Sequence, residues 1–232
     1  MNLAIVGYGK MGRLIDQLAP EYGFTVTQKL DEFNNPEQRG MTLENFRGVP
    51  VAIEFSTPET VVPNVRRLAE MRVHCVIGTT GWLSRIDEVR DIVTTAGTGL
   101  VWSPNYSIGV NVFSRLVREA ARLLQDEKEY EAWAWEIHHS AKLDAPSGTL
   151  IKLVHDMRAG GYTAPIDQSA SRAGQHPGTH EIGFDSAADT ITLRHSARSR
   201  EGFARGALKA AQWIAIRPGF HEFSDILFAP KQ

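Results

Sequence analysis

Short apolar runs alternate with amphipathic segments through the first 105 residues of the chain. Runs typical of strands buried on both faces lie at residues 3–6, 24–30, 49–56, 73–78 and 99–103. Apolar residues recur at helical spacing between several of them, at residues 11–19, 59–71 and 84–96. This alternation predicts an α/β fold, a doubly wound parallel sheet of the Rossmann type with helices on both faces.

The pattern changes after residue 105. The elements expected there are helices at residues 110–127, 149–158 and 203–216, strands at 130–139 and 190–196, and a loop rich in Gly, Ser and His at 169–179. Helices separated from a few strands indicate a second architecture. We therefore predict a discontinuous domain at residues 1–106 and 203–232, and a smaller α+β domain at residues 107–202.

The charge balance and the single cysteine narrow the class of protein. Lysine and arginine number 25 against 27 acids, a net charge of −2, which argues against nucleic-acid or acidic-membrane partners. No apolar run reaches the roughly 18 residues of a membrane span, and residues 1–6 lack the basic start of a signal peptide. Cys75 alone cannot form an intramolecular disulfide. These features predict a globular, cytoplasmic protein.

A G-x-G-x-x-G pattern is formed by Gly7-Tyr8-Gly9-Lys10-Met11-Gly12. It follows a predicted strand and opens a helix, and Asp31 lies 19 residues after Gly12 at the end of the next strand. Such a turn brings backbone and a helix N-terminus to a pyrophosphate. We predict that these six residues and Asp31 contact NADH or NADPH. The alternative is a turn that only connects strand and helix.

The residue type at position 31 bears on the choice of dinucleotide. An acid there accepts hydrogen bonds from a free ribose 2′-hydroxyl, and neighbouring Glu32 offers no cation for a 2′-phosphate. Lys10 and Lys29 compensate this negative charge in part. We therefore expect NADH, with some tolerance for NADPH.

Small hydroxyl and glycine residues follow three further predicted strands. Ligands of a doubly wound sheet bind at the carboxyl edge, where these segments lie. Each segment alone is typical of an ordinary loop, but together they favour contacts with the dinucleotide. The predicted contacts are Ser56, Thr57, Gly78, Thr79, Thr80, Ser103, Pro104, Asn105 and Tyr106.

Two histidines and a lysine, His138, His139 and Lys142, lie within five positions where a predicted strand ends. They combine proton-transfer groups with a cation. Immediately after them, Ser147-Gly148-Thr149 begins a helix and adds hydroxyl and N–H donors for a carboxylate or phosphate. The segment therefore predicts an anion pocket beside candidate acids.

Two alternatives to this pocket are a metal site and a purely structural loop. Adjacent strand residues point to opposite faces, so His138 and His139 do not favour one metal, and no zinc-ligand spacing is present. No metal is expected. His180 is expected to be structural, and His195 is left undecided.

The string Glu136-x-His138-His139-x-x-Lys142-x-Asp144-Ala145-Pro146-Ser147-Gly148-Thr149 resembles the signature of the 4-hydroxy-tetrahydrodipicolinate (dihydrodipicolinate) reductases of bacterial lysine biosynthesis. Other motifs occur in the family's order along nearly the whole chain. They are Gly7-x-Gly9-x-Met11-Gly12, Phe55-Ser56-Thr57-Pro58, Gly78-Thr79-Thr80-Gly81, Asn105-Tyr106-Ser107-x-Gly109-Val110-Asn111, Arg172-x-Gly174, Gly178-x-His180 and Phe203-Ala204-x-Gly206-Ala207-x-x-Ala210-Ala211-x-Trp213.

The resemblance implies an NAD(P)H-dependent reductase of a small dicarboxylate. It implies that His138 is the acid or base and that Lys142 donates a proton. His139 would bind substrate, with Ser147, Gly148 and Thr149 at one substrate carboxylate. It also implies that residues 107–202 form an open sheet that builds a homotetramer.

One stretch departs from the family. Residues 32–50 are too short and too poor in apolar periodicity for the helix and strand expected there, and Glu32 stands where the family often has a basic residue. Two rival functions are a dehydrogenase of another small carboxylate and a non-catalytic dinucleotide sensor. The first does not need the paired histidines, Lys142 and the helix start together, and the second does not need Lys142.

Overall fold

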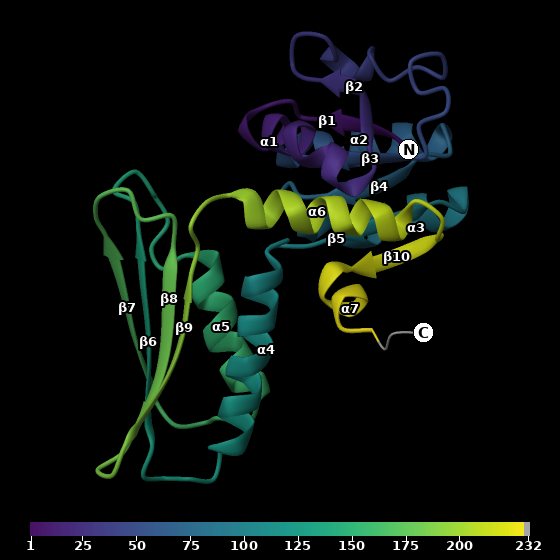
Figure 1. Ribbon diagram of the computed structural model, residues 1–232. Helices are drawn as coiled ribbons and strands as arrows, with labels where there is room; N and C mark the ends of the chain where they lie inside the picture. The colour runs from purple at the N-terminus through teal and green to yellow at the C-terminus, as the bar shows by residue number, and fades with distance from the viewer. Residues whose placement is uncertain (230–232) are drawn as a thin grey trace. The chain divides into compact units, whose positions relative to one another are not determined.

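The computed structural model of the chain describes residues 1–229 and divides into two compact units (Figure 1). Unit 1 comprises residues 1–107 and the segment that starts at Phe203, and unit 2 comprises Ile108–Gly202. Within the described part of the chain, no helix is long and apolar enough to cross a membrane.

A six-stranded sheet forms the centre of unit 1. Its order is β10-β5-β4-β3-β1-β2, and all neighbouring strands are parallel. The predicted Rossmann-type sheet is confirmed, with all five expected strands. The strands are β1 (Asn2–Val6), β2 (Thr25–Leu30), β3 (Val51–Glu54), β4 (His74–Ile77), β5 (Gly99–Trp102) and β10 (Gly219–Glu222).

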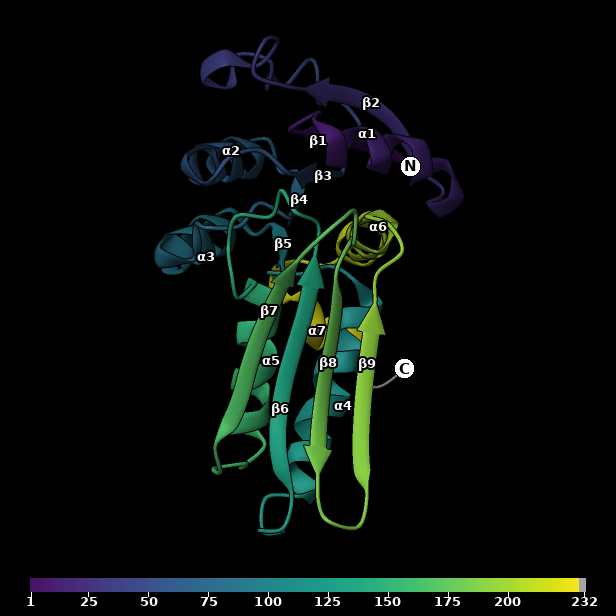
Figure 2. The same cartoon turned by 90° about the vertical axis from the view of Figure 1, so that its left-hand side faces the viewer.

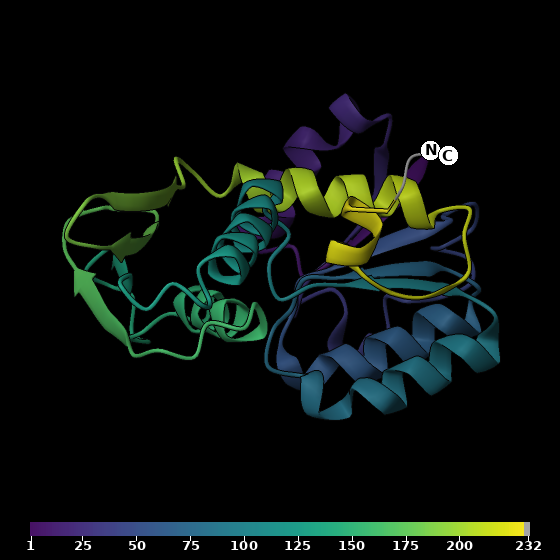
Figure 3. The same ribbon diagram turned by 90° about the horizontal axis from the view of Figure 1, so that it is seen from below.

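Helices cover both faces of this sheet, as expected of a doubly wound fold (Figure 3). α1 (Lys10–Leu18) and α6 (Glu201–Ile214) lie on one face, and α2 (Pro58–Glu70) and α3 (Ile86–Ala96) lie on the other. The central strands are therefore buried on both sides, which explains their continuous apolar runs. The short elements are the 3₁₀ turns η1 (Ala19–Tyr22), η2 (Pro36–Gln38) and η3 (Leu83–Arg85), and the helix α7 (Phe223–Leu227).

The stretch between β2 and β3 has no α-helix and no strand. Its one regular element is η2, in agreement with the departure expected at residues 32–50. Met41 and Phe46 are nevertheless buried in the core of unit 1. The connection is therefore a compact loop anchored by two apolar side chains.

Unit 2 is a four-stranded sheet with two helices on one face. The sheet order is β7-β6-β8-β9, in which β6 and β7 are parallel and the other pairs are antiparallel (Figure 2). Figure 1 shows both helices on the same side of this sheet. The elements are α4 (Ile108–Leu123), β6 (Glu131–His138), α5 (Gly148–Ala159), β7 (Ile166–Arg172), β8 (Thr179–Asp185) and β9 (Thr190–Ser196).

The predicted loop at residues 169–179 is wrong in its first part. β7 extends to Arg172, and the connecting loop is shorter than expected. The error has a physical reason: β7 is an edge strand whose middle residues are exposed, so its sequence Ile-Asp-Gln-Ser-Ala-Ser-Arg lacks the apolar alternation of a half-buried strand. β8 and β10 were equally absent from the expected elements, and β10 is a half-buried edge strand without an apolar run.

The two faces of the unit 2 sheet differ in burial. Ala132, Ala134, Ile182 and Phe184 pack with α4 and α5 in a continuous core. On the uncovered face, alternate β6 residues are only half-buried; these are Trp133, Trp135 and Ile137. The Trp133 indole lies over Gly183, where a Cβ would come within 2.1 Å of the ring. Unit 2 therefore carries an apolar strip on a face without helices.

The two glycines at the start of the G-x-G-x-x-G turn give a matched test of backbone constraint. Gly7 has φ +96°, and a Cβ there would lie 2.1 Å from the Phe55 carbonyl oxygen, whereas a Cβ on Gly9 meets no atom within 4 Å. We expect Gly7→Ala to lower the free energy of unfolding by about 2–4 kcal/mol and Gly9→Ala by less than about 1 kcal/mol. Urea denaturation followed by tryptophan fluorescence measures both; equal losses would contradict this account.

Candidate active site

The G-x-G-x-x-G turn lies at the carboxyl end of β1, where the strand order reverses. β1 pairs with β2 on one side and β3 on the other, so a ligand crevice is expected at this edge. The backbone N–H groups of Gly7 and Tyr8 both donate to the Leu30 carbonyl, at 2.8 and 2.9 Å. The turn is therefore fastened to the end of β2 before α1 begins.

The three glycines have distinct steric surroundings. A Cβ on Gly7 would meet the Phe55 carbonyl, and one on Gly12 would lie 2.5 Å from the Gly7 carbonyl oxygen. Gly9, the N-cap of α1, is exposed and has open space around it, and Met11 follows half-buried. A tight turn, an open N-terminus and a close helix packing are what a dinucleotide pyrophosphate needs, so these residues fit that group.

Positive charge near the turn is partly neutralised. Lys29 lies 2.7 Å from Asp16, whose carboxylate also accepts a 2.5 Å hydrogen bond from the Tyr8 hydroxyl. Arg13 and Lys29 lie 5.3 and 5.5 Å from the centre of the Tyr8 ring. Lys10 is exposed. Because Lys29 is paired with Asp16, it compensates the acid at position 31 less than the sequence alone indicates.

Asp31 is half-buried and closes the turn that follows β2. Its Oδ1 accepts hydrogen bonds from the backbone N–H groups of Phe33 and Asn34, at 2.9 and 3.1 Å. Glu32 is exposed beside it. Asp31 therefore has a local structural role in addition to the ribose contact predicted for it.

Residues at the end of β3 form a buried polar network. Thr57 caps α2 through a reciprocal capping box with Thr60. Glu54 is fully buried, and its Oε1 accepts hydrogen bonds from the N–H and hydroxyl of Ser56 and from Asn64. Burial raises the pKa of the Glu54 carboxyl, although the Ser56 hydrogen bonds oppose that rise. Glu54 had no predicted role, because it lies inside the strand predicted at residues 49–56.

The other predicted cofactor contacts divide into exposed and buried groups. Thr57, Thr80 and Pro104 are exposed, while Thr79 is buried. Gly78 lies under the Phe55 ring, which a Cβ there would overlap. The Tyr106 side chain is turned into the core, and its hydroxyl lies 2.9 and 3.0 Å from carbonyl oxygens at the ends of β4 and β5. Tyr106 can therefore contact a ligand only through its backbone.

Ser103 and Asn105 fix the turn that follows β5. The Ser103 hydroxyl donates to the Asn105 carbonyl at 2.8 Å and accepts from the Asn105 N–H at 3.1 Å. These contacts arise within three residues of the strand end. All predicted cofactor residues thus lie in unit 1, after β1, β2, β3, β4 or β5.

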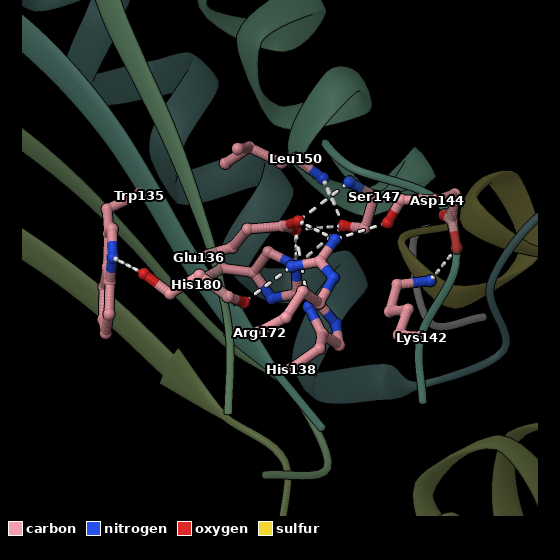
Figure 4. Close-up of polar contacts among 10 residues, drawn as sticks. Trp135, Glu136, His138, Lys142, Asp144, Ser147, Leu150, Arg172 and His180 are labelled. Carbon is pink, nitrogen blue, oxygen red and sulfur yellow. Dashed lines mark hydrogen bonds and ion pairs between the residues drawn. The ribbon is translucent and has the colours of Figure 1, made fainter. Parts of the chain in front are cut away.

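In unit 2, the histidine and lysine segment begins where β6 ends. His138 is the last residue of the strand and is 8% exposed, whereas His139 lies just beyond the strand and is half-buried. Lys142 follows in the loop, with its Nζ 2.6 Å from Asp144 Oδ1 (Figure 4). The Lys142 hydrogen bond holds the pKa of the Asp144 carboxyl below its usual value. In this structure Lys142 therefore faces an acid of its own loop.

One buried carboxylate, that of Glu136, draws the surrounding side chains together. Glu136 Oε1 accepts hydrogen bonds from the Ser147 N–H and from Arg172 Nη2, both at 2.8 Å. Oε2 accepts the Ser147 hydroxyl and lies 3.3 Å from His180 Nε2 and 3.6 Å from His138 Nδ1. We call these five residues the Glu136 cluster; Figure 4 shows them converging on the carboxylate.

The charges in the Glu136 cluster follow from burial and pairing. Burial by itself raises the pKa of the Glu136 carboxyl, but hydrogen bonds from Ser147 and Arg172 outweigh it and hold the pKa below its usual value. Burial lowers the pKa of His138, and the Glu136 charge opposes that change. Burial and neighbouring His138 lower the pKa of His180 to about 4. Near neutral pH the cluster therefore holds one ion pair and two neutral imidazoles.

The start of α5 offers N–H donors beside this cluster. Ser147 is the N-cap, and its hydroxyl accepts from the Leu150 N–H at 3.2 Å. Both donors of Ser147 are directed at Glu136, and the residue is 2% exposed. Gly148 is exposed with open space around it, and Thr149 is half-buried. The Gly148 N–H interacts with the Asp144 carboxylate, which an anion would have to displace, and Ser147 has no donor left for one.

Three members of the cluster, Glu136, Arg172 and His180, were not among the predicted site residues. Arg172 lies on β7 and His180 lies on β8, each more than thirty residues from Glu136 in sequence. The motifs Arg172-x-Gly174 and Gly178-x-His180 were noted, but no spacing rule connects them to His138. The tertiary pairing of β6 with β7 and β8 brings them together.

Glu136, His138 and His180 are also the one described group of three whose ligand atoms could hold a metal, all within 4.8 Å of one another. The carboxylate already accepts the Ser147 hydroxyl, and the Arg172 guanidinium lies 2.8 Å away. A cation would have to displace the first and would be repelled by the second. The donor set therefore does not favour a metal.

Protonation of His180 generates a testable pH dependence. The folded protein binds this proton near pH 4, and the unfolded imidazole binds it near its ordinary pKa of 6.5. Between these values the unfolded state holds more protons, so the free energy of unfolding falls as the pH falls. We expect His180→Gln to remove about 1–2 kcal/mol of the stability loss between pH 7 and pH 4.5.

The control for that experiment is His176→Gln, at an exposed position in the β7–β8 loop. Urea unfolding at several pH values measures all three proteins. If wild type, His176→Gln and His180→Gln lose stability in parallel, His180 is not the buried neutral group described above.

Comparison with known proteins shows the relationship of the chain. The model for the N-terminus of dihydrodipicolinate reductase matches residues 1–106, and the model for its C-terminus matches residues 109–227. A relative from Christiangramia forsetii, named 4-hydroxy-tetrahydrodipicolinate reductase, is 33% identical over 238 residues, 98% of each chain. A relative of the same name from Archaeoglobus fulgidus is 33% identical over 260 residues, 98% of this chain and 100% of the other.

A solved structure supports the same fold. The dipicolinate-bound dihydrodipicolinate reductase from Paenisporosarcina sp. TG-14 has a TM-score of 0.78 at 20% identity, and the match covers 97% of this chain and 99% of that one. The family models and the full-length relatives confirm the resemblance found in the sequence. The chain belongs to the dihydrodipicolinate reductase family.

Proposed function

We propose that the protein catalyses the NAD(P)H-dependent reduction of 4-hydroxy-tetrahydrodipicolinate to tetrahydrodipicolinate, a step of lysine and diaminopimelate biosynthesis. The observation that carries the proposal is the site in unit 2, where an exposed helix start, a lysine and two histidines, one of them buried, occur within twelve residues. Membership of the reductase family and the open glycine turn of unit 1 support it.

The 4-hydroxyl leaves as water together with a proton from carbon 3, which forms a carbon–carbon double bond conjugated with the ring imine. A dinucleotide bound at the glycine turn would supply the hydride for carbon 4 of this ring. Electron density then rests on carbon 3 and the ring nitrogen, and a proton at carbon 3 completes the reduction. Lys142 is the proton donor in this proposal, and His138 acts as the acid or base. The Lys142 ammonium becomes available when the substrate replaces Asp144 as its partner.

Two substrate carboxylates require cations and N–H donors. We assign one carboxylate to the N–H groups of Gly148 and Thr149 and the Thr149 hydroxyl, at the positive end of the α5 dipole. His139 and Lys142 serve the other. Ser147 supports this site as the N-cap that Glu136 holds, since its donors are already used.

For the dinucleotide we propose NADH in preference to NADPH. Asp31 and Glu32 place negative charge where a 2′-phosphate would bind, and Lys29 is already paired with Asp16. The glycine turn, Asp31 and the ends of β3, β4 and β5 are the proposed contacts. The single cysteine, buried in unit 1, is compatible with the reducing environment of the cytoplasm, which we propose as the location.

The proposed reaction is tested by coupling the protein to a dihydrodipicolinate synthase and following absorbance of NADH and NADPH in parallel. We expect oxidation of both, faster with NADH. Oxidation of neither would exclude this reductase, and binding of NADH without oxidation would favour a dinucleotide sensor instead.

Removal of the proposed proton donor gives a sharper test of the mechanism. Lys142→Ala is expected to lower kcat by about 100-fold or more while the affinity for NADH stays within twofold, because Lys142 acts on the substrate and not on the dinucleotide. Lys128→Ala, at an exposed turn of the same unit, is the control and should leave kcat unchanged. Unaltered turnover in Lys142→Ala removes that residue from the mechanism.

We also propose that the uncovered face of the unit 2 sheet assembles four chains. Trp133, Trp135 and Ile137 give this face an apolar strip that a partner copy would bury. Sedimentation velocity should give a tetramer for wild type, and Trp135→Lys should dissociate it. The control is Gln168→Lys on the neighbouring strand β7. Gln168 pairs with Ala134, which packs toward the helices, so this substitution should leave the tetramer intact. A monomeric wild type would contradict the proposal.

A further inference from the structure

Glu136 cannot touch the substrate, yet its carboxylate joins the parts of the proposed substrate site. It is fully buried on β6. Its partners come from the start of α5 (Ser147), from β7 (Arg172) and from β8 (His180). At least three donor hydrogens, two from Ser147 and one from Arg172, converge on its two oxygens. A fully satisfied carboxylate of this kind fixes the relative position of every group that donates to it.

Arg172 extends this connection to the loop that carries Lys142. Its Nη2 donates both to Glu136 and to the Asp144 carbonyl oxygen, and its Nη1 donates to the Ser171 carbonyl at 2.7 Å. The Ser140 N–H donates to the Gly174 carbonyl, so the same loop is also fastened beyond the end of β7. The segment from residue 142 to residue 149 is therefore held by Arg172 near its middle and by Glu136 at its end.

We propose that Glu136 and Arg172 form a positioning pair that sets the geometry of the substrate-binding segment at residues 142–149. The inference rests on the proposed function for the identity of the substrate. Neither residue is a catalytic residue in this account. Both act through others: Glu136 through Ser147 and the N–H groups that follow it, and Arg172 through the backbone that carries Asp144, the partner of Lys142.

The conservative substitutions Glu136→Gln and Arg172→Lys change the hydrogen-bond donors and acceptors of the Glu136 cluster. In Glu136→Gln a single acceptor oxygen faces the Ser147 N–H, the Ser147 hydroxyl and Arg172, so at least one buried donor loses its partner. In Arg172→Lys one ammonium replaces the planar guanidinium that spans Glu136 and Asp144. Both changes should loosen the start of α5 and the preceding loop without entering the substrate site.

The experiment compares Glu136→Gln, Arg172→Lys and Arg172→Gln with wild type in steady-state kinetics and in hydrogen–deuterium exchange. The matched controls are Glu119→Gln and Arg122→Lys, which alter an exposed ion pair on α4 of the same unit. We expect the KM for the substrate to rise by about tenfold or more, with the KM for NADH within twofold. Exchange should increase in residues 142–150 but not across β8 and β9, and Arg172→Lys should be milder than Arg172→Gln.

A pH profile adds a readout that a merely structural pair would not change. His138 faces Glu136 on its own strand, Lys142 and Asp144 in the loop, Arg172 on β7 and His180 on β8. Loss of the Glu136 charge lowers the pKa of His138, because that charge stabilises the imidazolium. The limb of the kcat/KM profile that reports His138 should therefore move to lower pH in Glu136→Gln.

Two outcomes would overturn the positioning role. One is a substrate KM and a pH profile equal to those of wild type in variants that fold. The other is faster exchange throughout unit 2 with equal changes in both KM values, which would mean a general loss of stability. If Glu136→Gln does not fold, the kinetics and the hydrogen–deuterium exchange of Arg172→Lys decide whether the pair has a positioning role. If wild type itself fails to reduce the substrate, the proposed function fails, and the exchange experiment still decides the positioning role.

Discussion

The burial of a single negative charge, on Glu136, is the constraint on which the site in unit 2 depends. A carboxylate without solvent is stable only when hydrogen bonds and an opposite charge replace its hydration. In this protein those partners are Ser147 at the start of α5, Arg172 on β7 and a histidine on β8. Satisfying one side chain of β6 therefore fixes a helix start and two strand ends at once. Gly148 and Thr149 come directly after Ser147 in the sequence. Because Glu136 fixes the position of Ser147, it also positions the N–H groups of these two residues.

In unit 1, close backbone contacts rather than buried side chains position the start of the helix at the proposed site. Gly7 and Gly12 bring β1, β3 and α1 into contact that no side chain would allow, and Gly9 leaves the N-terminus of α1 open. The N-terminus of α5 also has open space around Gly148, with the Asp144 carboxylate at the Gly148 N–H. Each unit thus presents one helix start that favours an anionic group. That pair of features suits a phosphate-bearing dinucleotide in one unit and a carboxylate in the other, although the net charge of the chain is only −2.

The sequence was sufficient to predict the strands and turns whose own residues carry a recognisable pattern. Buried parallel strands such as β3 and β4 have continuous apolar runs, and the glycine turn has a steric reason at Gly7 and Gly12. β7 and β10 were missed because edge strands with exposed or half-buried residues carry no apolar pattern. The His138 and Lys142 segment was predicted from spacing, but no role was predicted for Glu136. Its partner Arg172 lies 36 residues away, and only strand pairing brings the two together.

We propose that the chain reduces a cyclic dicarboxylate and that the start of α5, Lys142 and His139 hold its carboxylates. The most direct test is inhibition of wild-type turnover by dipicolinate, the ligand named for the Paenisporosarcina structure, compared with pyridine-2-carboxylate, which lacks one carboxylate. Each charge-assisted carboxylate contact is worth about 1.5–3 kcal/mol, so we predict competitive inhibition by dipicolinate that is roughly 10- to 100-fold stronger. Equal inhibition by the two compounds, or inhibition that does not compete with the substrate, would contradict the account.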